Sequence, residues 1–170
     1  MQASILKPDY PPVVNSIVTR IVAFITLLLA AGYLFSGSAW VLAYMLFEFL
    51  IRYLYGPRFS PVARLGIQIA SHSGLAPRMV AGQPKRFAQA IGTAFALTAL
   101  VLHTGGLPDF AILAMLVLSL FAALEAGIGF CAACLLFGFM IRLGWVQPES
   151  CEACSNLAFQ QPNHNSASNI

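Results

Sequence analysis

Residues 110–145 read FAILAMLVLSLFAALEAGIGFCAACLLFGFMIRLGW, and only Glu125 and Arg142 place a charge in this apolar run. A single helix of this length would extend about 50 Å, whereas the hydrocarbon core of a bilayer is about 30 Å thick. The stretch must therefore tilt, leave the membrane or break. Glycine weakens a helix by about 1 kcal/mol, so we expect the break at residues 127–129. Either a kinked, protruding helix or a hairpin with a fifth crossing would follow, and we favour the kinked helix.

The whole chain has the composition of an integral membrane protein. Of its 170 residues, 59% are hydrophobic and 9% are charged, and the mean hydropathy is +0.79. Soluble domains are roughly 45–50% apolar and about 25% charged. A soluble domain of this size has too little interior to hide so many apolar side chains. The sequence therefore predicts an all-α fold, a polytopic membrane helical bundle.

Three further apolar runs precede this stretch, at residues 17–35, 39–55 and 87–103. Each is close to the ~17–25 residues that cross a bilayer as a helix. The short turn at residues 36–38 makes the first two runs antiparallel neighbours. With the last stretch, the sequence predicts about four spans in a membrane domain covering residues 1–145. A cleaved signal peptide is the alternative for the first run, because small residues follow it.

The connection between the second and third spans, residues 56–86, is basic and contains no acidic residue. Because basic residues concentrate in cytoplasmic loops, we expect this loop and the N-terminus on the cytoplasmic side of a bacterial inner membrane. Membrane topology alone therefore accounts for the basic residues of this loop, and we do not expect nucleic acid as a partner. Val62, Leu65 and Ile69 recur at helical spacing and predict a short amphipathic helix on the membrane surface. The basic residues of the loop are Arg58, Arg64, Arg78, Lys85 and Arg86.

The charged side chains within the predicted spans include Glu48, Arg52 and Glu125. Glu48 and Arg52 are four residues apart and therefore share one helix face. We expect an intrahelical ion pair near the membrane interface, and a proton or anion site is the functional alternative. Glu125 should face protein rather than lipid, because an ionised carboxylate in hydrocarbon costs several kcal/mol.

The four cysteines form two Cys-x-x-Cys pairs, Cys131/Cys134 in the apolar run and Cys151/Cys154 in the polar tail of residues 146–170. The tail is rich in Asn and Ser, and we expect it to be flexible. If a new helix starts after the glycine break, the first pair lies in its first turns, where the helix dipole favours the thiolate. The pattern therefore favours thiol–disulfide exchange between the two pairs, the chemistry of a membrane thiol–disulfide oxidoreductase.

Glu125 is a further candidate for this chemistry. It precedes Cys131 by six residues. If the glycine break brings the two side chains together, the carboxylate can accept a proton from the thiol. Replacing it with Gln would then slow the reactions of Cys131.

Two other interpretations of the cysteines stay open. The spacing C-x2-C-x16-C-x2-C falls within that of a four-cysteine zinc site with Cys131, Cys134, Cys151 and Cys154 as ligands. Against it, the apolar helix between the pairs would hold them roughly 15 Å apart. Alternatively, the first pair merely fills a helix interface with small side chains. The protein would then be a membrane scaffold or subunit without catalytic activity.

Four stretches resemble landmarks of a known family. They are PPVVN (11–15), YGPRFSP (55–61), PKRFAQAIG (84–92) and LEAGIGFCAAC (124–134). The family comprises small bacterial integral membrane proteins grouped as a domain of unknown function, and the resemblance covers most of residues 10–145. It implies a compact domain of about four spans and no particular activity. The landmark positions that it implies are Arg58, Pro61, Lys85, Arg86, Glu125, Cys131 and Cys134.

The arrangement of the cysteines also resembles, in architecture only, that of small four-helix membrane thiol oxidoreductases coupled to quinones. This resemblance implies a quinone as the cofactor, whereas the metal interpretation implies zinc. A thioredoxin-like redox protein is the partner that such chemistry would use, beside the lipid bilayer itself. A homo-oligomer is compatible with the sequence.

Overall fold

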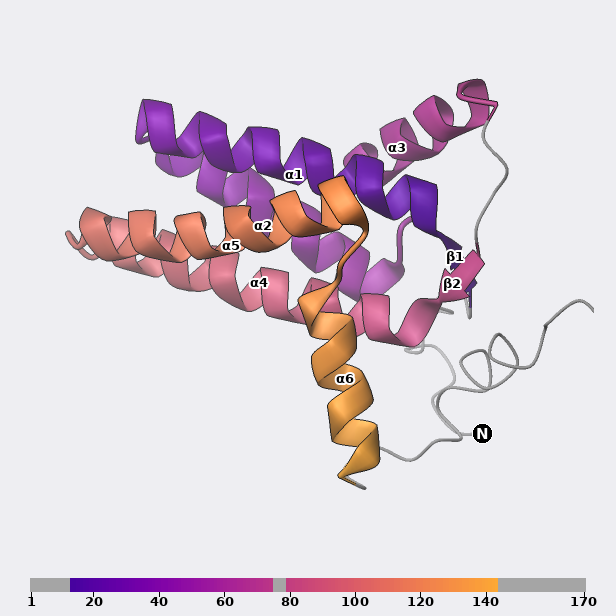
Figure 1. Cartoon of the computed structure of the whole chain (residues 1–170). Helices are drawn as coiled ribbons and strands as arrows, with labels where there is room; N and C mark the ends of the chain where they lie inside the picture. The colour runs from indigo at the N-terminus through magenta and orange to yellow at the C-terminus, as the bar shows by residue number, and fades with distance from the viewer. Residues whose placement is uncertain (1–12, 75–78, 144–170) are drawn as a thin grey trace, which may run out of the picture.

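The computed structural model describes residues 13–74 and 79–143, and in this part it is helical apart from two short strands (Figure 1). Strand β1 (Val13–Asn15) pairs antiparallel with β2 (Met79–Ala81). The prediction of a helical bundle is confirmed, but it missed this two-stranded ladder. The helices are α1 (Ser16–Ser36), α2 (Ala39–Tyr55), α3 (Pro61–His72), α4 (Gly82–Thr104), α5 (Pro108–Ile128) and α6 (Ala132–Arg142).

Among the described residues, three helices are long and apolar enough to cross a membrane: α1, α4 and α5. They contain 21, 23 and 21 residues, with mean hydropathies of 2.1, 1.4 and 2.3. The protein is therefore a multi-pass membrane protein, as predicted. Helix α2 has 17 residues and packs along α4. The turn that joins it to α1 contains Gly37 in the left-handed region, with φ 62°.

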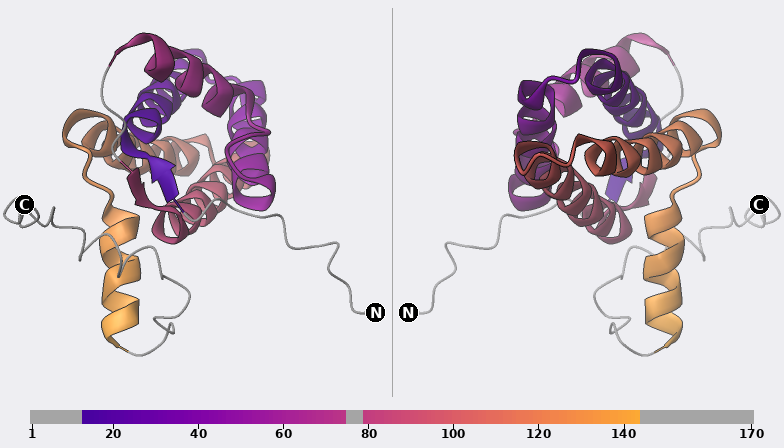
Figure 2. Two further views of the ribbon diagram at one scale, coloured as in Figure 1. Left: turned by 90° about the vertical axis from the view of Figure 1, so that its right-hand side faces the viewer. Right: turned by 90° about the vertical axis from the view of Figure 1, so that its left-hand side faces the viewer.

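Helices α1, α2, α4 and α5 lie side by side around a common axis, while α6 projects from one end of this bundle and contacts α4 (Figure 2). Small side chains let the helices approach closely. At Gly92 of α4, an added Cβ would lie 2.3 Å from the ring of Phe49 on α2, so this contact requires glycine. The core around it consists of Ala30, Tyr33, Leu42, Met45, Phe49, Ala96, Ala99, Ala111, Met115 and Leu118.

The last apolar stretch breaks where the sequence predicts. Helix α5 ends at Ile128, and Gly129 adopts φ 73°, with its N–H donating to Glu125 O at 3.0 Å. Only glycine enters this left-handed region without strain. Helix α6 then turns steeply away from α5 (Figure 1). Its 11 residues extend about 16 Å, which is too short to cross a bilayer. The described part therefore contains the kinked, protruding helix and no fifth crossing.

The helix predicted in the basic loop is present as α3, which packs against the start of α1. Val62 is buried there, and an added Cβ at Gly66 would meet Cγ2 of Val22 at 3.0 Å. Leu65 and Ile69, by contrast, are 48% and 45% exposed. Of the three predicted stripe residues, Val62 therefore contacts the bundle, and Leu65 and Ile69 remain largely exposed.

Helix α4 begins earlier than predicted, at Gly82 rather than near residue 87. Proline suits the first turn of a helix, because its φ is preset and its missing N–H would have no partner there. Pro84 occupies this turn directly after β2. Lys85 and Arg86, which were expected in a loop, consequently lie on α4, and Lys85 is buried at 9% exposure.

Candidate functional site

One end of the bundle gathers charged side chains from several helices. The ammonium of Lys85, near the start of α4, forms a salt bridge and hydrogen bond with Oε1 of Glu125, near the end of α5. Both side chains are largely enclosed, at 11% and 14% exposure. Glu125 thus faces protein, as predicted. Its partner is a lysine that was expected only as a basic loop residue and a family landmark.

The first cysteine pair lies at the start of α6. Cys131 directly precedes the helix, and the backbone N–H of Cys134 donates to Cys131 Sγ at 3.3 Å and to Cys131 O at 3.0 Å. Both thiols are free and half-buried. The predicted placement of this pair in the first turn of a new helix is therefore confirmed.

These two thiols lie beyond the end of α5, outside the membrane-spanning helices, and their acidities differ. The hydrogen bond that the Cys134 thiol donates lowers the pKa of Cys131, and the Lys85 ammonium lowers it further. Burial and the charge of Glu125 oppose this shift. The same hydrogen bond, followed by burial, raises the pKa of Cys134. Cys131 is therefore the more acidic thiol of the pair, and this setting favours its thiolate over that of Cys134.

Arg20 of α1 holds the turn that presents the cysteines. Its Nε donates to Ala126 O at 3.2 Å, and its guanidinium also donates to Gly127 O. These carbonyls lie in the last turn of α5, where the helix dipole favours a cation. From the sequence alone, Arg20 was expected to extend from the first turn to the lipid headgroups. Its contact with α5 was missed, because no local spacing connects residues that are 106 positions apart.

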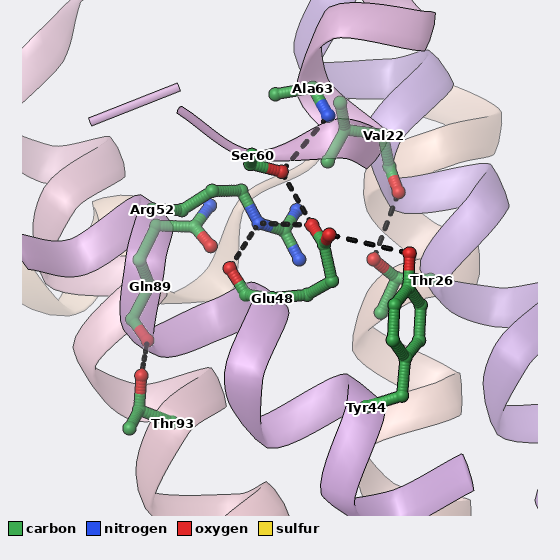
Figure 3. Close-up of polar contacts among 9 residues, drawn as sticks. All are labelled: Val22, Thr26, Tyr44, Glu48, Arg52, Ser60, Ala63, Gln89 and Thr93. Atoms are coloured by element: carbon green, nitrogen blue, oxygen red, sulfur yellow. Dashed lines mark hydrogen bonds and ion pairs between the residues drawn. The ribbon is translucent and has the colours of Figure 1, made fainter. Parts of the chain in front are cut away.

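A second polar cluster connects α2 to α3 (Figure 3). Glu48 is fully buried and accepts hydrogen bonds from Ser60 Oγ and, at 3.4 Å, from Tyr44. Arg52 Nε lies 4.0 Å from the Glu48 carboxylate and donates to Glu48 O at 3.0 Å. Ser60 also caps α3 by accepting from Ala63 N at 3.0 Å. The predicted intrahelical ion pair is present, and the cluster fixes the entry into α3.

A cavity of about 720 Å³ opens between the charged end and the bundle interior, and Lys85, Glu125 and Cys131 all line it. Gln89 of α4 also lines it, and among the described side chains its Oε1 is a buried acceptor without a hydrogen-bond partner. Gln89 was not among the site residues expected from the sequence. The only indication of its role in the sequence is its position one helical turn after Lys85.

The second cysteine pair, Cys151 and Cys154, lies outside the described residues. Exchange between the two pairs and the four-cysteine zinc site both stay predictions. Within residues 13–74 and 79–143, no group of three or more His, Cys, Asp or Glu side chains is arranged to hold a metal ion.

A comparison with protein families matches residues 14–142 to a domain of unknown function, DUF4395. No curated protein and no solved structure matches the chain. The matched segment contains Arg20, the Glu48 cluster, Lys85, Glu125 and the first cysteine pair, which agrees with the resemblance seen in the sequence. The chain belongs to the DUF4395 family.

Proposed function

We propose that this protein carries out thiol–disulfide exchange at Cys131 and Cys134 in a bacterial inner membrane. The observation that supports it best is the hydrogen bond of Cys131 Sγ with the Cys134 N–H at the start of α6, beside the Lys85 ammonium. A thiolate in this setting is stabilised by the helix start and by a nearby cation. Reactive cysteines of Cys-x-x-Cys pairs use the same features.

The reaction follows from the different acidities of the two thiols. The Cys131 thiolate attacks a disulfide of the substrate, forming a mixed disulfide and releasing one substrate thiolate. Cys134 then gives its proton to this thiolate and attacks Cys131 Sγ. The products are a Cys131–Cys134 disulfide and a substrate dithiol. Two electrons pass to the substrate with the proton of Cys134, and the second substrate thiolate takes from water the proton that Cys131 lost on ionising.

Four crossings account for the arrangement of the helices. Helix α2, at 17 residues, reaches the lower limit for a span and lies between α1 and α4 in the bundle. The basic residues Arg58, Arg64, Lys85 and Arg86 belong to the end that carries α3, and we assign this end to the cytoplasm. Helix α6, with Leu135, Leu136 and Phe139 exposed, would lie in the membrane interface there.

This orientation puts Cys131 and Cys134 on the cytoplasmic side, where thiols are kept reduced. A thioredoxin-like dithiol protein is therefore the appropriate partner to exchange electrons with them. The tail pair Cys151/Cys154 would carry electrons between that partner and the pair on α6, as the sequence pattern indicates.

Trapping a mixed disulfide tests the proposal. With Cys134→Ser, a disulfide on Cys131 cannot be resolved, so we expect mass spectrometry under non-reducing conditions to find Cys131 linked to Cys151 or Cys154. Cys131→Ser is the matched control and should give no such link from Cys134.

Metal analysis of the wild-type protein accompanies this experiment. One zinc ion per chain that protects all four thiols from alkylation until a chelator removes it would indicate a metal site in place of the exchange reaction. Thiols that stay free and alkylate slowly in every variant would contradict the proposal and leave the cysteines a packing role in a scaffold.

A further inference from the structure

The cavity beside Cys131 is mostly apolar and has the size of a small-molecule site. Its volume of about 720 Å³ falls within the ~300–1,000 Å³ typical of ligand pockets. Side chains from α1, α4 and α5 line it, among them Val18, Val22, Phe95, Leu118 and Phe121. Because these helices cross the membrane, a ligand for this cavity is a lipid-soluble molecule.

Polar groups are gathered at one part of the cavity wall. Lys85 and Gln89, one turn apart on α4, both line it, as does Arg52 of α2. In Figure 3 the side chains of Gln89 and Arg52 lie next to each other. Within the part of the chain that the structure describes, the Gln89 Oε1 atom is buried without a donor, which is unfavourable unless a ligand supplies one. The cavity thus provides both hydrogen-bond donors and an unused acceptor.

Cys131 supplies the redox group of this cavity, since it belongs to the same wall. We propose that the cavity binds a membrane quinone, which accepts the electrons of the Cys131–Cys134 dithiol. The Lys85 ammonium and Gln89 amide donate to a quinone carbonyl, and Gln89 Oε1 accepts from the hydroxyl of the quinol. A lipid acyl chain would fill the apolar part, but it has neither the carbonyl acceptor that a quinone offers to Lys85 nor the hydroxyl donor that a quinol offers to Gln89.

The proposed transfer balances without a further reactant. The two thiols lose two electrons and two protons and form one S–S bond. The quinone gains both electrons and both protons and leaves as the quinol. The cysteines then return to the dithiol state by exchange with a cytoplasmic dithiol, so this inference rests on the proposed function for its electron supply.

Binding is tested separately from electron transfer with a photoreactive short-chain ubiquinone on the full chain in lipid nanodiscs. We expect cross-links to α1, α4 or α5 side chains of the cavity in the wild type and equally in a Cys131→Ser, Cys134→Ser variant. Ala88→Phe fills the cavity from α4 and should reduce labelling about tenfold. Ala90→Phe, two residues along the same helix and outside the cavity wall, should leave labelling unchanged.

Gln89→Leu is a milder second variant, because leucine keeps the volume and removes the polar atoms. It should weaken quinone binding about tenfold while the thiols still react with oxidised glutathione. Equal labelling of Ala88→Phe and Ala90→Phe, or labelling that excess unlabelled phospholipid displaces as well as excess quinone does, would overturn the inference.

Electron transfer is then measured as quinone absorbance after mixing with reduced protein. We expect one quinol per Cys131–Cys134 disulfide formed. If the thiols cycle with glutathione but leave the quinone oxidised, the inference fails and the proposed function stands. If quinone binds but no disulfide forms in any buffer, the exchange reaction and the transfer both fail, and only the binding site remains.

Discussion

The two ends of the bundle are built differently. At the end where α1 and α4 begin, three helices are joined by the Lys85–Glu125 ion pair and by hydrogen bonds from Arg20 to backbone carbonyls, and Cys131 lies close to Lys85 and Glu125. At the opposite end the connections are short, as at Gly37 and at residues 105–107. A polar contact between helices at this end joins Tyr33 OH and His103 Nδ1, at 3.1 Å.

This difference separates two tasks of the fold. The end with short turns keeps four helices in antiparallel contact and needs few polar groups to do so. The end with β1, α3 and α6 holds charges that are costly to bury unless they are paired. Maintaining such a cluster beside a dithiol is understandable if the charges tune the thiol, which is the core of the proposed function.

The largest expected effect is in labelling from outside the cell, because the two ends lie on opposite sides of the membrane. In a variant with all four cysteines replaced by Ser, a single cysteine at Ser71 of α3 should be inaccessible to an impermeant maleimide added to intact cells. A single cysteine at Asp109, at the start of α5, should be labelled fully. Labelling of Ser71→Cys from outside would reverse the assigned orientation.

Stability should depend more on the charged end. Glu48→Ala removes the partner of a buried arginine and of Ser60, so we expect a loss of about 3–5 kcal/mol in the free energy of unfolding. The measurement is denaturant unfolding in detergent micelles. Asp109→Ala, at an exposed position of the other end, is the control and should change stability little. Similar losses in both variants would remove the distinction between the ends.

Thiol reactivity should depend on Lys85. Lys85→Met removes the cation that lowers the pKa of Cys131, so the pKa rises and less thiolate is present at a given pH. At pH values below the pKa, we therefore expect alkylation to slow severalfold. The rate is followed by mass spectrometry against pH, with Arg86→Met as the control on the next residue. An unchanged pH profile for Lys85→Met would contradict the electrostatic account.

Glu125→Gln should change the alkylation rate of Cys131 in the opposite direction. Its carboxylate raises the pKa of Cys131, so its neutralisation should lower that pKa and speed alkylation near neutral pH. A proton-acceptor role for Glu125, as predicted from the sequence, requires slower reaction instead. The sign of the change therefore decides between the two roles.

A smaller effect compares two glycines of the same conformation. Gly129 precedes the cysteine pair with φ 73°, and Gly106 lies at the other end with φ 81°. Replacing either with Ala forces a side chain into the left-handed region and should cost about 1 kcal/mol. Only Gly129→Ala should also change the alkylation rate of Cys131. Equal rates in both variants would show that the turn does not position the thiol.

Sequence reasoning found the features that local patterns encode. Hydrophobic runs predicted the helices, and two glycines in an apolar stretch predicted the break before Cys131. The same break predicted that Cys131 and Cys134 lie at a helix start, because a helix must restart after it. Each of these inferences depends on neighbouring residues only.

The contacts that make the site were beyond such patterns. Lys85 and Glu125 are 40 residues apart, and Arg20 is farther still from the carbonyls that it binds. Their meeting depends on how four helices are ordered around the axis, which hydrophobicity does not specify. The strands β1 and β2 have three residues each, too few to show the alternation of apolar and polar side chains that predicts a strand.

The most direct test of the central claim is the redox equilibrium of Cys131 and Cys134 in a Cys151→Ser, Cys154→Ser variant. The protein is equilibrated in glutathione buffers, alkylated and weighed by mass spectrometry. We predict a reversible disulfide with a midpoint between about −120 and −270 mV, the range of thiol–disulfide oxidoreductases. Thiols that stay reduced in fully oxidised glutathione, or a disulfide that forms below about −300 mV and resists reduction, would contradict the account.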